Sequence, residues 1–168
     1  MMRTRPIVEA DLPLIRTWMR DAPEAPAWGD DDLDAIVKAP SGEERRIRRG
    51  WVAEEDSPPA VAGFVVATAL SIPDAPVESE LEFIFVLPQI RRQGIGRVLV
   101  NVVFAWARER GAEEIRLEVR ASNARALRLY ERCGFVVAGN RPGYYVDPPE
   151  DAVLMRCRIG YGRGDAPV

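Results

Sequence analysis

The sequence of 168 residues contains no histidine, and this absence excludes several kinds of chemistry. Without an imidazole, neither a Ser-His-Asp triad nor a Cys-His pair can form, and most zinc sites lose a usual ligand. Cysteine is nearly absent too, since only Cys133 and Cys157 occur. Two distant thiols in a chain without a secretory segment are more often reduced core residues than a disulfide. We therefore expect no metal and no disulfide.

Long basic runs and long apolar runs are also missing. The formal net charge is -3, from 23 Lys and Arg against 26 Asp and Glu. A nucleic-acid-binding face needs a sustained basic stretch, so nucleic acid is not an expected partner. No segment approaches the roughly 18 to 20 apolar residues of a membrane span, and the first residues lack the apolar core of a signal peptide. The prediction is a cytoplasmic protein without a membrane partner, as a monomer or homodimer.

The length suits one domain with its own hydrophobic core. The apolar patterns predict, in order, a strand, two helices, two antiparallel strands, a buried strand, a helix, an alternating strand, a helix and two last strands. This order predicts an α/β fold in which about four helices cover a mixed sheet of six to seven strands. The polar stretch 41–49 is predicted as a linker or short turn, and the stretch 141–150 as a loop. We expect residues 1–159 to form the domain and residues 160–168 to be a flexible tail.

The segment 81–97 joins a buried strand to a helix through a short basic turn. Residues 81–87 are almost all apolar, and Pro88 ends the strand because proline cannot donate to a strand ladder. Apolar side chains recur at helical spacing from Val98 onward. The first amides of a helix have no intrahelical partner and carry partial positive charge. Gly94 and Gly96 leave space for a bulky anion, and the arginines add positive charge. The turn is therefore a candidate site for a phosphate or pyrophosphate.

Two common nucleotide-binding loops do not fit this turn. A dinucleotide loop needs a third glycine where this chain has Leu99, and a P-loop needs Gly-Lys-Ser or Gly-Lys-Thr where residues 96–98 read Gly-Arg-Val. What remains is Arg91-x-x-Gly94-x-Gly96 after a buried strand. This pattern resembles the pyrophosphate loop of the acyl-CoA-dependent N-acetyltransferases of the GNAT superfamily, although by itself it also fits a simple tight turn.

A candidate carboxylate lies in the alternating strand 114–120. One helix links this strand to the strand 81–87, so the two should be parallel neighbours, and ligands bind beyond the carboxyl ends of such strands. Glu118 stands near that end, on the face opposite to Leu117. Spacing alone leaves two interpretations open, a group at the reactive end of the ligand and a solvated carboxylate like Glu114.

Longer motifs extend the resemblance. Residues 117–123 read Leu-Glu-Val-Arg-Ala-Ser-Asn, residues 129–135 read Leu-Tyr-Glu-Arg-Cys-Gly-Phe, and residues 140–145 read Asn-Arg-Pro-Gly-Tyr-Tyr. Together with the loop 91–97, they resemble the ribosomal-protein-alanine N-acetyltransferases of the RimI type, densely from about residue 81 to residue 155. The segments 30–32, 45–49 and 72–79 depart from that pattern. The resemblance therefore implies acetyl transfer more firmly than it implies an acceptor.

The resemblance implies acetyl-CoA as co-substrate and a role for each matching residue. Glu118 is implied as general base, Tyr130 as the acid that protonates the departing thiolate, and Asn123 as a contact of the CoA arm. The backbone of three strand residues is implied to hold the pantetheine arm and polarise the thioester carbonyl, namely Ile84, Phe85 and Val86. The pyrophosphate is implied to bind the loop of Arg91, Arg92, Gln93, Gly94, Ile95, Gly96 and Arg97.

Proton chemistry sets conditions on these roles. An unperturbed Glu is a weak base, so Glu118 needs a water relay or surroundings that favour its protonated form. A tyrosine with a pKa near 10 protonates a thiolate with a pKa near 8.5 only uphill, so Tyr130 would act partly by hydrogen bonding. Tyr130 also fits a core aromatic, and Trp28 also fits a tryptophan packed over a helix N-terminus.

The acceptor amine must be neutral when it attacks. An α-amine with a pKa near 7.7 to 8 is roughly a tenth or more neutral at pH 7, whereas a lysine near 10.4 is only about 0.04% neutral. This favours a protein N-terminus, with Trp28, Tyr144 and Tyr145 as candidate contacts. The resemblance implies, more narrowly, the N-terminal alanine of a small-subunit ribosomal protein. The alternatives are a small amine (polyamine, aminoglycoside or amino acid), which the acidic segment 30–32 would favour, and a non-catalytic acyl-CoA-binding module.

Overall fold

The computed structural model describes residues 1–38, 42, 44–56 and 58–160. Its strands are β1 (Met2–Pro6), β2 (Arg46–Asp56), β3 (Pro59–Leu70), β4 (Val77–Val86), β5 (Ala112–Arg120), β6 (Val136–Val146) and β7 (Pro149–Arg158). They form a seven-stranded sheet in the order β1-β2-β3-β4-β5-β7-β6. Within the described ranges, the α-helices are α1 (Leu12–Asp21), α2 (Asp30–Val37), α3 (Ile95–Glu109) and α4 (Ala124–Arg132). The predicted mixed sheet with about four helices is confirmed, and all of the predicted tail except residue 160 lies outside the described residues.

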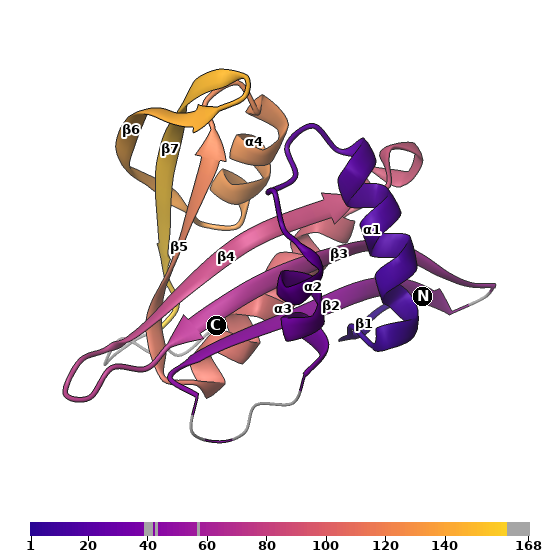
Figure 1. The fold of residues 1–168 in the computed structure, drawn as a ribbon, viewed down its shortest axis with the longest axis horizontal. Helices are drawn as coiled ribbons and strands as arrows, with labels where there is room; N and C mark the ends of the chain where they lie inside the picture. Colours follow the sequence, from indigo (N-terminus) through magenta and orange to yellow (C-terminus); the bar gives the residue numbers. More distant parts are fainter. Residues whose placement is uncertain (39–41, 43, 57, 161–168) are drawn as a thin grey trace.

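The helices cover both faces of the sheet. Helices α1 and α2 lie over one face, and α3 lies behind the other (Figure 1). The core on the α3 side includes Leu99, Val65 and Leu117, whereas the core on the α1 and α2 side includes Ile15 and Phe64. Because Phe64 and Val65 point to opposite faces and are both fully buried, β3 is a central strand, which explains its continuous apolar run. None of the helices in the described ranges is long and apolar enough to cross a membrane.

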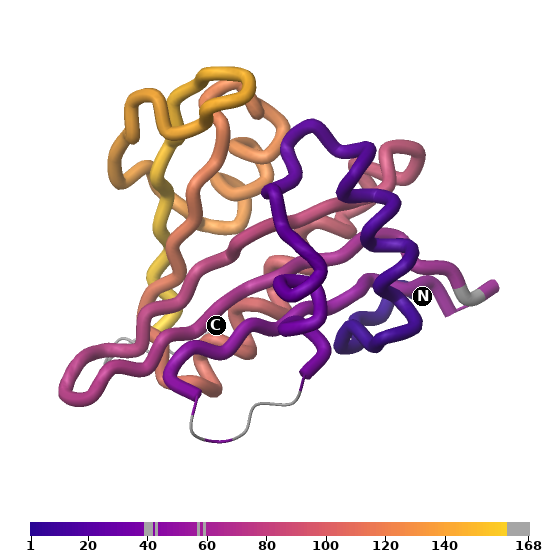
Figure 2. The backbone as a smooth tube through the Cα atoms, viewed as in Figure 1, coloured from indigo at the N-terminus to yellow at the C-terminus, as the bar shows by residue number. Residues whose placement is uncertain are grey.

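Strands β4 and β5 begin as parallel neighbours and then separate. Their register runs from Val77 opposite Ala112 to Glu80 opposite Arg116, and no later pair is formed between the described residues of the two strands. Strand β4 nevertheless continues to Val86, and β5 remains paired with β7 from Glu114 to Arg120. Both backbone drawings show the two strands diverging (Figure 1, Figure 2). We call the region between their unpaired ends the β4–β5 opening.

A bulge in β4 lies next to this opening. Val66 of β3 pairs with Phe83, and the next residue of β3 pairs with Leu81, so Glu82 is the extra residue. The bulge changes which face the following side chains occupy. Leu81 packs in the core on the α3 side, whereas Phe83 packs against the core on the α1 and α2 side.

Two segments differ from the sequence-based expectation. The polar stretch 41–49 is predicted as a linker or short turn, but Arg46 already begins β2. The stretch 141–150 is predicted as a loop, but β6 runs to Val146 and β7 begins at Pro149. Strand β6 is an edge strand with most side chains exposed, and its register shifts twice against β7. An exposed, irregular edge tolerates proline and shows no alternation of apolar residues, so its sequence resembles a loop.

Candidate active site

The turn between β4 and α3 has the geometry of an anion-binding loop. Arg92 and Gly94 both have left-handed backbones, with φ of 66° and 84°. Backbones that alternate in this way gather successive N–H groups into a concave nest that binds anions. The nest leads directly into α3, a helix of 15 residues whose first amides and dipole add to the same positive end. The predicted strand-to-helix turn is therefore present with the expected polarity.

The two glycines of this loop serve different purposes. A Cβ on Gly94 would have nothing within 4 Å, so the requirement there is its left-handed conformation. A Cβ on Gly96 would lie 2.9 Å from Cδ2 of Leu129 in α4. The sequence-based reason for Gly96, space for an anion, is thus incomplete, because its lack of a side chain also lets α3 and α4 approach closely.

The arginines around the loop differ in their contacts. Arg91 donates from Nε to the carbonyl oxygen of Val86, at 2.8 Å, and so ties the loop to the end of β4. Burial lowers the pKa of Arg91, and the nearby positive charge of Arg125 lowers that pKa further. Arg92 and Arg97 are exposed. Arg125, in the first turn of α4, is a residue that the sequence motifs do not single out. Two neighbouring cations at one loop favour an anion between them.

Replacing Arg125 with glutamine is expected to raise the KM for acetyl-CoA about tenfold, the loss of one charge-assisted hydrogen bond of roughly 1.5 kcal/mol. The change should be similar for acetyl-dephospho-CoA if the guanidinium contacts the pyrophosphate. Steady-state kinetics with both thioesters measure this, and Arg132→Gln, in the last turn of the same helix, is the matched control. An unchanged KM for Arg125→Gln would remove this residue from the site.

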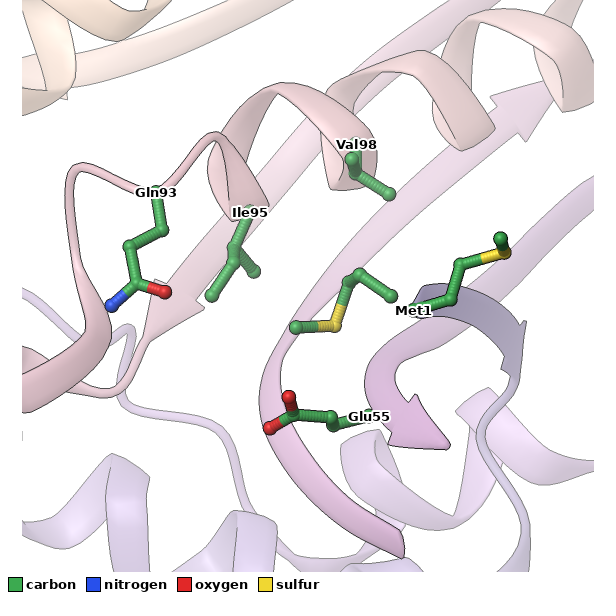
Figure 3. Close-up of a pocket in the computed structure, with 6 residues that line it drawn as sticks. Met1, Glu55, Gln93, Ile95 and Val98 are labelled. Carbon is green, nitrogen blue, oxygen red and sulfur yellow. The ribbon is translucent and has the colours of Figure 1, made fainter. Parts of the chain in front are cut away.

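A hollow borders the other end of the loop (Figure 3). It is lined by Gln93, Ile95 and Val98 from the loop and α3, and by the N-terminal Met1, Met2 of β1 and Glu55 of β2. The carboxylate of Glu55 brings negative charge to this hollow. A phosphate is therefore expected at the backbone nest rather than here.

Backbone groups of β4 face the β4–β5 opening. Ile84, Phe85 and Val86 still pair with β3 on one side, but they have no β5 partner on the other. In a β-strand, the N–H and C=O groups of alternate residues point to opposite sides. Some of the backbone groups in this stretch are therefore free to pair with an extended ligand lying in the opening, as an added strand would.

Glu118 lies on β5 beside this opening and has two partners from β6. Its side chain is 20% exposed, and its Oε1 forms an ion pair with Nη1 of Arg141. A hydrogen bond with Glu118 is the main cause that raises the pKa of Tyr144 to about 12. Leu117 and Val119 point into the core on the α3 side, so Glu118 points to the α1 and α2 side. It is not a fully solvated carboxylate.

The adjacent tyrosines are held by cation–π contacts. The guanidinium of Arg141 lies 4.8 Å from the ring centre of Tyr144, and that of Arg120 lies 4.1 Å from the ring centre of Tyr145. The two rings meet edge to face, with centres 5.1 Å apart. Strand β6 therefore brings both predicted tyrosines to the end of β5.

Glu80 is a second carboxylate beside the opening, and the sequence reasoning missed it. It is the last residue of β4 that pairs with β5, opposite Arg116. Burial raises the pKa of Glu80, and the charges of Glu82 and Glu118 raise it further. The sequence does indicate that Glu80 points to the opposite face from the apolar Leu81. Only the structure shows that the pairing of β4 with β5 ends here, which brings the Glu80 side chain near Glu118.

The Glu80→Gln variant is expected to have a higher Tm than the wild type at pH 7.5, with little difference near pH 4. The folded state disfavours the charged form of Glu80, whereas an unfolded glutamate ionises above about pH 4.3, so wild-type stability falls as the pH rises through this range. Glutamine carries no charge and avoids this loss. Thermal unfolding followed by circular dichroism measures it, with the exposed Glu78→Gln on the same strand as control. A lower Tm of Glu80→Gln at pH 7.5 would contradict the assignment.

Tyr130 and Asn123 lie on α4 and at its start. Tyr130 is 5% exposed, and its ring centre lies 5.6 Å from that of Phe135. Burial raises the pKa of Tyr130, with further contributions from Tyr145 and Cys133, so the hydroxyl stays protonated at neutral pH. Asn123 caps the helix, because its Oδ1 accepts from the N–H of Ala126 at 3.2 Å. This contact leaves the amide NH₂ of Asn123 free to donate to a ligand.

Trp28 lies in the connection between α1 and α2 and contacts β4. Its ring packs edge-on against Phe83, with centres 6.2 Å apart. Phe83 belongs to the part of β4 that borders the opening, so Trp28 is near the site as well as near the start of α2. The acidic segment 30–32 is largely compensated, since Asp30 pairs with Arg16 and Asp32 pairs with Arg48.

Several known proteins resemble this chain in sequence. The sequence model of the acetyltransferase (GNAT) family matches residues 12–135. The [ribosomal protein bS18]-alanine N-acetyltransferase of Escherichia coli strain K12 is 45% identical over 84 residues, which are 49% of this chain and 57% of that protein. An N-alpha-acetyltransferase of Sulfurisphaera tokodaii is 35% identical over 113 residues, 62% of this chain and 66% of that protein.

A solved structure extends the likeness to the whole fold. The crystal structure of the ribosomal-protein-S18-alanine N-acetyltransferase from Escherichia coli has a TM-score of 0.73 and 29% identity, and the superposition covers 100% of both chains. In sequence, the chain spans little more than half the length of the curated Escherichia coli relative. The family match runs from α1 through α4 and includes the nest, the β4–β5 opening and Glu118. The chain belongs to the acetyltransferase (GNAT) family.

Proposed function

We propose that this protein transfers the acetyl group of acetyl-CoA to the α-amine of a protein N-terminus, such as the N-terminal alanine of a small-subunit ribosomal protein. The observation that carries the proposal is Glu118 beside the β4–β5 opening, where unpaired β4 backbone can hold a thioester. The relatives named as ribosomal-protein-alanine N-acetyltransferases support this choice of acceptor.

The chain offers a matching contact for each part of acetyl-CoA. The nest at Arg92 and Gly94, the start of α3 and Arg125 suit the pyrophosphate. The amides of the pantetheine arm can pair with the free backbone groups of β4, as in strand addition. A backbone N–H in the same stretch can then donate to the thioester carbonyl and stabilise the negative charge that develops on its oxygen.

Glu118 is proposed to take the proton from the attacking amine, directly or through one water. A carboxylate offers about four lone-pair sites, so contacts with Arg141 and Tyr144 leave sites for the amine. The carbonyl carbon of the acetyl group then forms an amide bond with the amine nitrogen and loses its bond to the CoA sulfur, which leaves as a thiolate. Tyr130 is proposed to donate a hydrogen bond to the leaving sulfur, because its raised pKa makes complete proton transfer uphill.

An N-terminal α-amine is favoured over a small polycationic amine for two reasons. The α-amine is more often neutral at pH 7. In addition, the acidic segment that would attract a polycation is largely used within the protein, since Asp30 and Asp32 are paired with arginines. An exposed carboxylate that already holds a guanidinium attracts a second cation less strongly.

The test uses the purified chain, acetyl-CoA and a short peptide that begins with alanine. The expected result is CoA release together with a peptide that carries one acetyl group, located at the α-amine by fragmentation in a mass spectrometer. The same peptide with a blocked N-terminus is the control, and spermidine tests the small-amine alternative. CoA release with the peptide no faster than in buffer would overturn the proposal.

A further inference from the structure

Arg48 of β2 contacts three separate segments on the α1 and α2 side of the sheet. Its Nη1 lies 2.9 Å from Oδ1 of Asp32 in α2, and its Nη2 lies 3.0 Å from Oε2 of Glu82 in β4. Its guanidinium carbon also lies 5.2 Å from the ring centre of Trp28. The Arg48 side chain is only 18% exposed. One planar guanidinium therefore holds two carboxylates and covers an aromatic ring.

The contact with Glu82 fixes the bulge of β4. The side chain of Glu82 is 8% exposed, and a carboxylate so deeply buried requires a close cation. Arg46 also approaches Glu82, but at 3.5 Å and with 61% of its side chain exposed. Arg48 is thus the main partner of the residue that directly precedes Phe83 and the unpaired end of β4.

The contact with Asp32 fixes the start of α2. Asp32 also accepts from the backbone N–H of Gly29, at 3.0 Å, and so closes the first turn of the helix. Trp28 immediately precedes that glycine, and its ring contacts Phe83. Arg48 therefore links the segment that carries Trp28 to the strand that carries Phe83.

These groups share a sheet face with the proposed base. Phe83 and Trp28 pack against the core on the α1 and α2 side, and Glu118 points to the same side. We propose that Arg48 is a positioning residue for the acceptor: by joining Asp32 to Glu82, it holds Trp28 and Phe83 as one wall of the site that receives the acceptor peptide. This inference rests on the proposed function.

The test measures KM and kcat separately with the peptide that begins with alanine. In Arg48→Met, the KM for the peptide should rise about tenfold, while kcat and the KM for acetyl-CoA stay within about twofold. Arg46→Met is the matched control, because Arg46 contacts the same carboxylate without touching α2 or Trp28, and its kinetics should equal those of the wild type. A general structural defect would instead change both KM values. The Tm does not separate the two cases, because removing the main cation beside the buried Glu82 lowers it in either case.

Asp32→Asn provides a second variant if Arg48→Met does not fold. It weakens the tether to α2 but leaves the Arg48–Glu82 pair intact. It should raise the KM for the peptide in the same direction and accelerate hydrogen exchange in α2, for example at the Leu33 amide that donates to Gly29. If the wild type acetylates the peptide and both variants keep its KM, the inference on Arg48 is wrong. If the wild type does not acetylate the peptide, the proposed function fails, and the acceptor role of Arg48 fails with it.

Discussion

The Glu118→Gln variant is expected to lose a factor of about 10² to 10⁴ in kcat for peptide acetylation, the usual contribution of a general base, while the KM for acetyl-CoA stays within about twofold. Glutamine has nearly the same shape as glutamate, and its carbonyl oxygen can still accept from Arg141. The variant therefore removes the ability to take a proton and leaves the surroundings in place. Single-turnover and steady-state measurements of CoA release would measure the loss.

Two further variants distinguish proton transfer from a structural role. Glu114→Gln lies on the same strand and the same face, where Glu114 pairs with Arg116 and Arg156 at the surface, and it should keep full activity. Arg141→Met removes the partner of Glu118 but keeps the carboxylate, so its loss in kcat should be much smaller. An Arg141→Met variant as inactive as Glu118→Gln would show that the ion pair, and not the base, is what matters.

The pH dependence of Glu118→Gln adds a separate check. The free α-amine has a pKa near 7.7 to 8, so at pH 9 most of it is neutral without help from the enzyme. The ratio of wild-type to variant kcat/KM for the peptide should therefore become smaller between pH 7 and pH 9. A ratio that grows over this range would contradict the removal of a proton from the amine by Glu118.

The parts of the site that are built by residues close together in the sequence could be predicted from the sequence. A buried strand, a proline, a basic turn with Gly94 and a helical pattern are all local signals, and they predict the strand-to-helix junction that the structure contains. The cap at Asn123 is equally local. The reason for Gly96 is not, because the side chain that a Cβ would meet belongs to Leu129 in another helix.

Residues that depend on contacts between distant strands could not be predicted in this way. Arg48 lies in a stretch that resembles a polar linker, and its two carboxylate partners come from α2 and from the bulge of β4. Arg141 lies in a stretch that resembles a loop, although it is part of an edge strand and pairs with Glu118. Nothing in the local pattern shows a bulge or the end of a strand pairing, and both decide which charged side chains meet.

Tyr130→Phe is the second change with a large expected effect. The hydroxyl is proposed to stabilise the thiolate that leaves, and a hydrogen bond to a charged group is worth about 1.5 to 3 kcal/mol, so kcat should fall by roughly 10- to 150-fold. The ring itself packs against Phe135 in the core, and phenylalanine keeps that contact. The Tm of the variant should therefore stay close to that of the wild type, which separates loss of the hydroxyl from loss of packing.

The pH profile tells whether Tyr130 donates a hydrogen bond or ionises during turnover. Burial raises the pKa of Tyr130 above its usual value, so the hydroxyl remains protonated throughout the range in which the amine becomes neutral. Between pH 8 and pH 10, kcat should therefore change with pH in the same way in the wild type and in Tyr130→Phe. A decline found only in the wild type would mean that Tyr130 loses its proton in that range, and full activity of Tyr130→Phe would mean that the leaving sulfur finds its donor elsewhere. The raised pKa that makes Tyr130 a poor acid is thus what keeps it available as a hydrogen-bond donor at every pH at which the amine can attack.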